Sequence, residues 1–335
     1  MYSQYLDACA QQRVLIIGDI ILDEYIFGEV RRISPEAPIP VVVTRRREYR
    51  AGGAGNVALN IAALGGTPLL CGVVGADVPA TQLADMLGKQ LTPGTAYLIT
   101  SPDRPTTLKS RILAQNQQMV RLDTEETAPV PASVEEELLA VVRAQLQSVQ
   151  AVVLSDYAKG VLSDRVCREV ITLGAAHGLP VIVDPKGVGY ARYAGCTLIT
   201  PNRYEACVAT NQSIHSPADL DAVAAALLAL LAGGSLLLTR GEEGMSLYRP
   251  QQAPMHIAAK ARTVYDVTGA GDTVVANLAL ALATRLPMEA AVALANYAAS
   301  IVVGKLGATP VTRDEMRELL AQVRASAGET LSAPC

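Results

Sequence analysis

The string Asp-Val-Thr-Gly-Ala-Gly-Asp-Thr at residues 266–273 is the part of the sequence best suited to chemistry on phosphates. The apolar residues 274–284 that follow it predict a helix, so the Gly-Ala-Gly turn opens that helix. A helix N-terminus presents free backbone N–H groups and a partial positive charge, and small residues let a ligand approach the backbone closely. Asp272 could simply cap this helix, but the full string predicts an anion-binding turn beside a functional carboxylate.

A second glycine-rich turn, Ala-Gly-Gly-Ala-Gly-Asn at residues 51–56, also precedes a predicted helix. Its polar member, Asn56, can hydrogen-bond to hydroxyl groups. Asp19 and Asp23 come just after the first predicted strand, residues 14–18. In parallel α/β sheets, ligands bind beyond the carboxyl ends of the strands. These three side chains therefore predict a site for a polyhydroxylated ligand.

Other common phosphate and metal motifs do not match. The first strand lacks the glycine triplet of dinucleotide-binding folds, which argues against a nicotinamide dehydrogenase. No Gly-Lys-Ser/Thr sequence marks a P-loop. The three histidines, His177, His215 and His256, are widely spaced, so a multi-histidine metal site is not expected. The six cysteines form no Cys-x-x-Cys pair and no secretory signal precedes them, so we expect reduced thiols in a cytoplasmic protein.

The 335 residues are 50% hydrophobic and 18% charged, with a formal net charge of −4. This composition excludes a disordered chain and disfavours a nucleic-acid-binding protein, which usually has a basic balance. An anionic ligand must therefore be held by a local cluster of cations. Residues 222–239 carry no charge, but Gly233, Gly234 and Ser235 divide them. The run predicts a buried helix, a turn and a buried strand at 236–239, and not a membrane span.

Short apolar runs alternate with longer helical patterns along the chain. Runs typical of strands lie at 14–18, 69–74, 151–155, 180–184 and 197–200. Patterns typical of helices lie at 54–64, 81–91, 135–147 and 164–177, with Ser133 as a candidate N-cap for the third. Strand-like runs that are apolar throughout indicate a parallel sheet covered on both faces. We predict a single α/β domain over residues 1–335, because no linker divides the chain.

Two segments, residues 24–50 and 97–123, break this alternation with shorter and more polar strand-like pieces. A small sheet cannot bury both of its own faces, so it must cover a cleft or pair with another subunit. We predict a small antiparallel sheet that forms a lid, and a homodimer through the lid sheets. Arg45, Arg46 and Arg47 would alternate between two strand faces, so we interpret this run as a solvated sheet edge.

Three motifs together resemble the ribokinase-type (PfkB) carbohydrate kinases: Gly-Gly-Ala-Gly-Asn at 52–56, Pro-Asn-x-x-Glu at 201–205, and the string at 266–273. They occur in the order typical of the family, and the resemblance covers about residues 12–325. Gly55 stands where the family often has alanine. The resemblance implies a ribokinase-like three-layer α/β sandwich with a mostly parallel central sheet and a small β-sheet lid.

Four further strings, at 32–41, 116–123, 154–160 and 183–187, resemble a narrower family, the D-glycero-β-D-manno-heptose-7-phosphate kinases. This resemblance implies ATP-dependent phosphorylation of O1 of the heptose 7-phosphate for lipopolysaccharide core synthesis. In many bacteria this kinase is fused to a C-terminal nucleotidyltransferase; the chain has no His-x-Gly-His signature, so a stand-alone kinase is expected. The alternatives are another ribokinase-type sugar or sugar-phosphate kinase, and a catalytically silent sugar- or nucleotide-binding regulator.

The resemblance also implies the catalytic roles. Asp272 would be the base toward the sugar hydroxyl, and we expect the helix N-terminus to lower its pKa and keep it ionised. The backbone N–H groups of Gly269, Ala270 and Gly271 would stabilise charge that develops on the transferred phosphoryl group.

Two cofactors are implied, ATP and Mg²⁺. Asn202 and Glu205 follow the predicted strand 197–200 and would position Mg²⁺ through water. Glu205 could alternatively be a plain acidic residue in the first turn of a helix. The residues implied to contact ATP are Asn202, Glu205, Lys186, Thr239, Gly241, Gly244 and Thr268.

The implied sugar phosphate needs cations for its 7-phosphate. Lys109 and Arg111 would share one face of a strand, and Arg121 and Arg32 are further candidates. The other residues expected in the substrate site are Asp19, Gly52, Gly53, Asn56, Asn116, Gln118, Asp123, Asp156 and Lys159. No nucleic-acid or membrane partner is expected.

Overall fold

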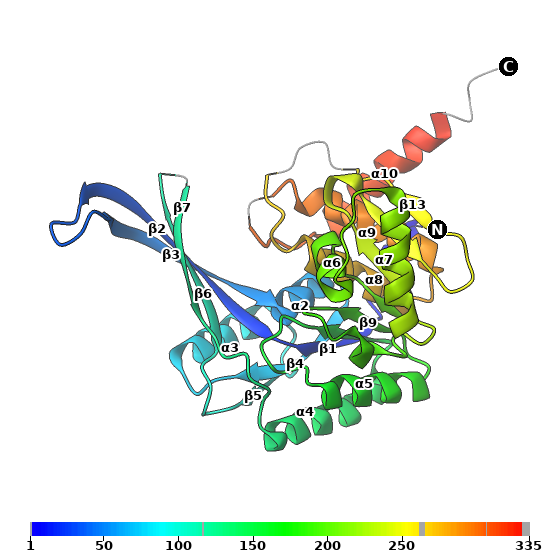
Figure 1. Ribbon diagram of the computed structural model, residues 1–335, viewed down its shortest axis with the longest axis horizontal. Coiled ribbons are helices and arrows are strands. Elements are labelled where there is room, and N and C mark those ends of the chain that lie inside the picture. Colours follow the sequence, from blue (N-terminus) through cyan, green and yellow to red (C-terminus); the bar gives the residue numbers. More distant parts are fainter. Residues whose placement is uncertain (1, 116, 261–264, 306, 330–335) are drawn as a thin grey trace.

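The computed structural model describes residues 2–115, 117–260, 265–305 and 307–329. The body of the protein is a nine-stranded sheet with helices on both faces (Figure 1). In spatial order its strands are β13 (Met255–Ile257), β12 (Met245–Tyr248), β11 (Ser235–Thr239), β10 (Leu198–Ile199), β9 (Val181–Asp184), β8 (Ala151–Ser155), β1 (Arg13–Gly18), β4 (Thr67–Val74) and β5 (Ala96–Thr100). Neighbours from β5 to β11 run parallel, and β12 and β13 add antiparallel at one edge.

Alternate side chains of each central strand enter two different cores. Ile16 of β1 belongs to one core and Ile17 to the other, because successive residues of a strand point to opposite faces. The first core contacts α1 (Tyr2–Cys9), α2 (Ala54–Ala63), α3 (Val78–Gln90), α8 (Ala270–Ala283), α9 (Met288–Val302) and α10 (Arg313–Glu329). The second contacts α4 (Ala132–Gln145), α5 (Asp164–Ala176), α6 (Arg203–Thr210) and α7 (Pro217–Leu230). The predicted three-layer α/β sandwich with a mostly parallel sheet is confirmed.

A second, four-stranded sheet extends away from this body (Figure 1). Its strands, in spatial order, are β3 (Pro40–Gly53), β2 (Ile20–Ile33), β6 (Thr107–Ala114) and β7 (Gln117–Thr124). The outer pairs are antiparallel, whereas β2 and β6 run parallel. Arg45, Arg46 and Arg47 lie exposed on the edge strand β3, as predicted for a solvated edge.

Three details differ from the sequence prediction. Strand β5, which we placed in the second excursion, is the edge strand of the large sheet, so only residues 107–124 of that segment enter the small sheet. The small sheet also takes more of the first segment, because β2 starts at Ile20 and β3 ends at Gly53. Ser133 lies inside α4, whose N-cap is Pro131, so the predicted serine cap was wrong.

In the part of the chain that the structure describes, no helix is both long and apolar enough to cross a lipid bilayer. The predicted division of the uncharged run 222–239 is confirmed: α7 ends at Leu230, and β11 begins at Ser235. Short 3-10 turns complete the elements: η1 (Leu146–Ser148), η2 (Tyr190–Tyr193) and η3 (Gly241–Glu243).

Candidate active site

The carboxyl ends of the parallel strands open onto a cavity of about 150 Å³. Parallel sheets bring these ends together on one edge, which is why residues far apart in the sequence meet there. The N-terminus of α8 contributes Gly271 to the same cavity. Its lining residues are Asp156, Tyr157, Asp184, Pro185, Lys186, Thr200, Asn202, Glu205, Thr239 and Gly271. The cavity thus joins predicted nucleotide-site residues to the Gly-Ala-Gly turn.

Asp272 is the third residue of α8 and is only 4% exposed, with Gly269 in the N-cap position. Asn56 Nδ2 donates to its Oδ2 at 2.6 Å, and the Tyr157 hydroxyl donates to its Oδ1 at 2.7 Å. Burial raises the pKa of Asp272 to about 6, although these two hydrogen bonds favour its charged form. The expectation of a lowered pKa was therefore wrong, because the cost of burying the charge outweighs the helix N-terminus.

The partner of Asp272 on α2 is itself held in place by buried polar groups. Asn60 Nδ2 donates to the side-chain oxygen of Asn56, Oδ1, at 3.3 Å, and to its backbone oxygen at 2.9 Å. The Thr273 hydroxyl, next to Asp272 on α8, donates to Asn60 Oδ1 at 3.0 Å. Buried amides in a connected network have a defined orientation. The Asn56 amide is thereby oriented toward Asp272. A sugar hydroxyl that contacts this amide would therefore also lie beside the Asp272 carboxylate.

The turn before α8 requires small residues for two separate reasons. Gly269 has a φ of +78°, and a Cβ at this position would lie 2.8 Å from Asn56 Nδ2. Gly271 has open space around its Cβ position and lines the cavity, so its backbone faces the site directly. The N–H of Ala270 donates to the Val267 oxygen at 3.2 Å. This member of the predicted anion cradle is therefore already hydrogen-bonded in the structure.

Asp266, the first residue of the motif, ties the turn together. Its Oδ1 accepts from the backbone N–H and the hydroxyl of Thr268, at 2.9 and 2.6 Å, and its Oδ2 accepts from Gly307 N–H at 2.8 Å. These hydrogen bonds keep the pKa of Asp266 below its usual value despite partial burial. The Thr268 hydroxyl, which we predicted to contact ATP, is thus engaged by Asp266.

Asn202 and Glu205 form a capping box at the start of α6. Asn202 Oδ1 accepts from Glu205 N–H, and Glu205 Oε2 accepts from Asn202 N–H, each at 2.9 Å. The other Glu205 oxygen, Oε1, lies 2.6 Å from Lys186 Nζ. The helix-capping alternative for Glu205 is therefore present, and the same residues also line the cavity.

The cavity has an oxygen-rich wall that suits a hydrated cation. Asp184 ends β9 with one hydrogen bond from the Thr200 hydroxyl at 3.3 Å, and burial together with the charges of Asp272 and Glu205 raises its pKa well above the usual range. Among the described residues, no group of three or more His, Cys, Asp or Glu side chains is arranged to hold a metal directly. The donors fit an ion that keeps several waters, as Mg²⁺ does.

The loop after β11 supplies the remaining predicted nucleotide residues. Thr239 bridges to Asn202 in the large sheet. Gly241 and Gly244 have φ values of +60° and +92°, and a Cβ at Gly244 would lie 2.0 Å from the Ile257 oxygen. The tight turn 241–244 therefore needs both glycines for its backbone, and Thr239 alone of the three lines the cavity.

Asp19 anchors the loop that follows β8 and is 1% exposed. Its carboxylate accepts three backbone N–H bonds from this loop: Tyr157 at 2.7 Å, Lys159 at 3.1 Å and Val161 at 3.3 Å. Burial, followed by the charge of Asp156, raises the pKa of Asp19 to about 6. Asp19 thus holds this loop, and its contact with a sugar hydroxyl stays a prediction.

Asp156, on the same loop, points toward an arginine and a tyrosine of the η2 region. Arg192 Nη2 donates to its Oδ2 at 2.6 Å, and the Tyr193 hydroxyl donates to the same oxygen at 2.7 Å. The neighbouring Lys159 ammonium contacts Glu125 Oε1 at 2.8 Å, beyond the end of β7. The loop therefore connects the large sheet with the segment that follows the small sheet.

The cations predicted for the substrate phosphate lie on one face of the small sheet, but each is paired with an acid. Lys109 contacts Asp123 at 3.1 Å and Glu125 at 3.2 Å. Arg111 contacts Asp23 at 2.5 Å, and Arg121 contacts Asp123 at 2.8 Å. Lys109 and Arg111 lie two residues apart on β6, so their side chains share one face of the sheet, as predicted. The strand register places Asp23 and Asp123 on either side of Lys109.

Two other predicted residues of the small sheet, Arg32 and Gln118, are not brought to this cluster. Arg32 lies nine positions beyond Asp23 on β2, about 30 Å along the strand. Gln118 is exposed on β7, beyond a register irregularity between Ile112 and Leu113 on β6. Asn116 falls outside the described residues.

Gly52 and Gly53, at the end of β3, allow close packing beside the site. A Cβ at Gly52 would lie 2.4 Å from Asp23 Oδ2, and one at Gly53 would lie 2.3 Å from the Asp19 backbone oxygen. Gly53 also has a φ of +57°. Gly53 is therefore required by its backbone conformation, whereas Gly52 leaves room for the Asp23 side chain.

Three functional candidates were not predicted: Tyr157, Asp184 and Glu125. Tyr157 and Asp184 stand inside strings that carried the resemblance, at 154–160 and 183–187, so position in a motif was the available signal. Glu125 lies just past such a string, and nothing in its spacing shows that Lys109 and Lys159 converge on it.

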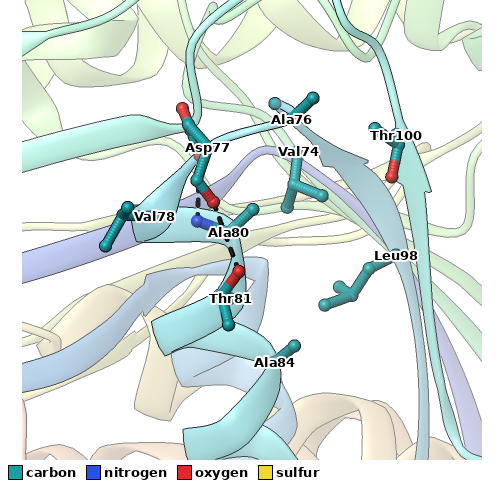
Figure 2. A pocket seen from close by; sticks show the side chains of 10 residues that line it. Val74, Ala76, Asp77, Val78, Ala80, Thr81, Ala84, Leu98 and Thr100 are labelled. Carbon is teal, nitrogen blue, oxygen red and sulfur yellow. Dashed lines mark hydrogen bonds between the residues drawn. The ribbon is translucent and has the colours of Figure 1, made fainter.

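A larger cavity, of about 590 Å³, lies elsewhere, between the ends of β4 and β5 and the start of α3. Figure 2 shows small apolar side chains such as Ala80 and Ala84 on its wall. Its acid, Asp77, caps α3 by accepting from Ala80 N–H at 3.0 Å, and its two oxygens also accept from Thr106. The chemical groups needed for group transfer gather in the smaller cavity.

The motifs and the geometry agree with a known family. The family model for pfkB family carbohydrate kinases matches residues 11–315. The chain belongs to this family. The matched region includes Asp272 and the turn before α8, so both belong to the kinase domain.

Curated relatives of this pfkB kinase include two bifunctional proteins named HldE. The one from Methylobacillus flagellatus is 45% identical over 317 residues, 94% of this chain and 64% of that protein. The one from Alkalilimnicola ehrlichii is 48% identical over 330 residues, 97% of this chain and 66% of that protein. The chain thus spans slightly less than two thirds of the length of these relatives.

Solved structures share the fold at lower identity. Ribokinase from Arabidopsis thaliana, complexed with ribose and ATP, has a TM-score of 0.71 and 21% identity, covering 92% of this chain and 98% of that one. Phosphofructokinase-2 from Escherichia coli, in complex with potassium, has a TM-score of 0.75 and 19% identity, covering 93% and 99%. These likenesses confirm the ribokinase-like fold.

Proposed function

We propose that this pfkB kinase transfers the γ-phosphoryl group of ATP to O1 of D-glycero-β-D-manno-heptose 7-phosphate, giving the 1,7-bisphosphate for lipopolysaccharide core synthesis. The carrying observation is the Asp272 carboxylate, buried at the N-terminus of α8 between Asn56 and Tyr157. The similarity to proteins named HldE and the four heptose-kinase strings support the choice of sugar.

In the proposed reaction, the sugar hydroxyl oxygen forms a bond to the γ-phosphorus of ATP, and the bond between that phosphorus and the ADP oxygen breaks. Asp272 accepts the proton that the sugar hydroxyl loses. With a pKa of about 6, the carboxylate is mostly ionised at neutral pH and remains basic enough to take the proton. The backbone of Gly269 and Gly271 at the positive end of α8 stabilises charge on the phosphoryl oxygens.

ATP would lie along the cavity, with its phosphates toward Gly271, Thr239 and Lys186. Asn202, Glu205 and Asp184 would hold hydrated Mg²⁺, which supplies charge neutralisation on the phosphates when bound. Lys186 already neutralises Glu205 at 2.6 Å, so it can exchange that carboxylate for a phosphate oxygen. ATP as the donor is consistent with a cytoplasmic enzyme.

The small sheet would act as the lid over the sugar phosphate, with Lys109, Arg111 and Arg121 near its 7-phosphate. Lys109 and Arg111 are each only about one-sixth exposed, which favours strong contacts with an anion. The opposite face of this sheet carries Val120 and Leu122, which are 44% and 56% exposed. We propose that this face, which also carries the Glu24–Arg47 ion pair, forms a homodimer contact through these exposed apolar side chains.

An ADP-release assay with purified protein and Mg-ATP tests the proposal. We expect turnover with heptose 7-phosphate and much weaker turnover with unphosphorylated heptose, ribose, fructose, fructose 1-phosphate and fructose 6-phosphate. ³¹P NMR of the product should show a new phosphate on the anomeric carbon. Preference for one of the other sugars would instead identify another sugar kinase. Binding without turnover on the whole panel would indicate a silent regulator.

A further inference from the structure

Tyr157 is placed by a loop that the fold holds rigidly. The loop lies between β8 and α5, and its N–H groups at Tyr157 and Lys159 both donate to the Asp19 carboxylate. Gly160 has a φ of +83°, and a Cβ there would lie 2.0 Å from the Ala128 oxygen, so the loop packs tightly on the segment beneath it. The backbone that carries Tyr157 is thus held by Asp19 and by its packing on the segment at Ala128.

The Tyr157 hydroxyl donates to Asp272 Oδ1 at 2.7 Å, a distance typical of a strong O–H···O⁻ hydrogen bond. Burial and the nearby Asp272 charge raise the pKa of Tyr157 well above its usual value, so the phenol stays protonated. Asn56 Nδ2 donates a hydrogen bond to the other carboxylate oxygen of Asp272, Oδ2. Each oxygen of Asp272 therefore has one protein donor and keeps lone-pair capacity for a substrate hydroxyl.

We propose that Tyr157 is a positioning residue for phosphoryl transfer: its hydroxyl holds the Asp272 carboxylate in the orientation and charge state in which it accepts the substrate proton. The inference rests on the proposed function only in requiring a hydroxyl acceptor, whichever sugar carries it. Removing the hydroxyl should leave Asp272 buried with one donor fewer, so that its charged form is less stable.

The other groups around Asp272 determine how such a change is interpreted. The positive end of α8 and the Asn56 amide of α2 favour its charged form, while Asp23 of β2 opposes it. Asp184 of β9 also interacts with the Asp272 charge. Arg111 neutralises Asp23. None of these groups is altered by Tyr157→Phe, so a change in titration in that variant is due to the lost hydroxyl.

The kinetic test is Tyr157→Phe, compared with Tyr248→Phe. Tyr248 donates to Asp221 at 2.9 Å, so it is a matched tyrosine–aspartate pair remote from the site. In Tyr157→Phe we expect the acid limb of kcat/KM to rise by about one pH unit. The kcat at pH 6.5 should fall about threefold, with recovery toward pH 8 and an unchanged KM for ATP. Tyr248→Phe should keep the wild-type profile.

A second measurement does not depend on activity. The folded-state pKa of Asp272 is above the ordinary value, so its contribution to stability is lost as pH rises through that pKa. The Tm difference between wild type and Asp272→Asn should therefore level off just above pH 6. In the Tyr157→Phe background, the same difference should level off about one pH unit higher.

An unchanged acid limb in Tyr157→Phe, or equal levelling points in the two backgrounds, would overturn the inference. Tyr157→Phe could fail to give a cooperative thermal transition; the tyrosines of the wild type are then replaced biosynthetically with 3,5-difluorotyrosine, which is a stronger hydrogen-bond donor. This replacement should lower the pH at which the Tm difference from Asp272→Asn levels off. No change in that pH would overturn the inference. Failure of the wild type to phosphorylate any sugar would refute the proposed function, while the thermal measurement would still decide the role of Tyr157.

Discussion

Burial and hydrogen bonding act on Asp272 in opposite directions. The site removes water from the carboxylate, and two side-chain donors return part of the lost stabilisation. The result is a carboxyl group with a pKa of about 6, which is mostly ionised at neutral pH and a stronger base than an ordinary aspartate.

Asp272→Asn should lower kcat by about a thousandfold, because the amide cannot take the hydroxyl proton. Nucleotide binding should be retained, since the cavity walls around Thr239 and Lys186 do not depend on this charge. Steady-state kinetics and calorimetric titration with ADP check both parts. A kcat within tenfold of wild type would remove the proton-accepting role from Asp272.

The pH profile of kcat/KM should show an acid limb with a midpoint near 6. Below this pH Asp272 is protonated, so activity falls about tenfold per pH unit; above it the carboxylate is charged and activity levels off. Initial rates between pH 4.5 and 8.5 measure this directly. A midpoint near 4 would mean that the helix N-terminus outweighs burial after all.

Sequence reasoning identified Asp272 and its turn because glycine spacing before a helix reports backbone chemistry directly. It placed the pKa of Asp272 in the wrong direction, since burial depends on how α2, α8 and the loop after β8 pack around it. It also missed Tyr157, whose contact spans 115 residues of sequence. Such contacts are set by tertiary packing and leave no local spacing pattern.

At the scale of elements, the two glycines at the start of α8 have different roles: Gly269 is needed for the fold of the turn, and Gly271 leaves the cavity open. Gly271→Ala should raise stability by about 0.5–1 kcal/mol, because alanine favours helix and no atom lies within 4 Å of its Cβ position. The same methyl group enters the cavity wall, so kcat or the KM for ATP should worsen at least tenfold. Thermal unfolding and kinetics on one preparation test the combination.

Gly269→Ala is the matched control. Its added methyl group meets Asn56 Nδ2 at 2.8 Å and requires a positive φ, so it should lower Tm as well as activity. If Gly271→Ala also lost stability, or kept full activity, the assignment of that residue to the cavity wall would be incorrect.

The small sheet should show a graded dependence on its cations. Lys109→Gln should raise the KM for heptose 7-phosphate about tenfold, because Lys109 is mostly buried and its loss leaves the Asp123 carboxylate without this cation beside the phosphate. Arg121→Gln should change this KM less than threefold, since Arg121 is 48% exposed. The KM for ATP is the internal control. Equal effects of the two variants would contradict the placement of the phosphate near Lys109.

Six parallel strands of the large sheet, β1, β4, β8, β9, β10 and β11, followed from the sequence because parallel strands buried on both faces are apolar throughout. The antiparallel edge strands β12 and β13 were not predicted. The excursion at 97–123 was harder: β5 is short and half-buried, so its composition resembles that of the small sheet, and only its pairing with β4 assigns it. The acid partners of Lys109 and Arg111 were likewise unpredictable, because cross-strand register decides them.

At the scale of the whole molecule, we proposed a homodimer contact on the face of the small sheet that carries Val120 and Leu122. If the proposed dimer forms, Leu122→Lys should convert it to a monomer in light scattering, because a charge in place of this exposed leucine is costly to bury in the contact. Val78→Lys is the control, since Val78 is 69% exposed on α3. A monomeric wild type, or a dimeric Leu122→Lys variant, would refute the contact.

The ion pairs on the inner face of the small sheet make substrate capture an exchange of anions. In the proposed complex, a phosphate at Lys109 would take the place of the Glu125 carboxylate, which would move out into water, so few bound counter-ions would be released overall. Affinity for the sugar phosphate should then vary only weakly with ionic strength. The same exchange favours a doubly charged phosphate over singly charged anions, because only the former brings more charge to the lysines than the carboxylate that it displaces.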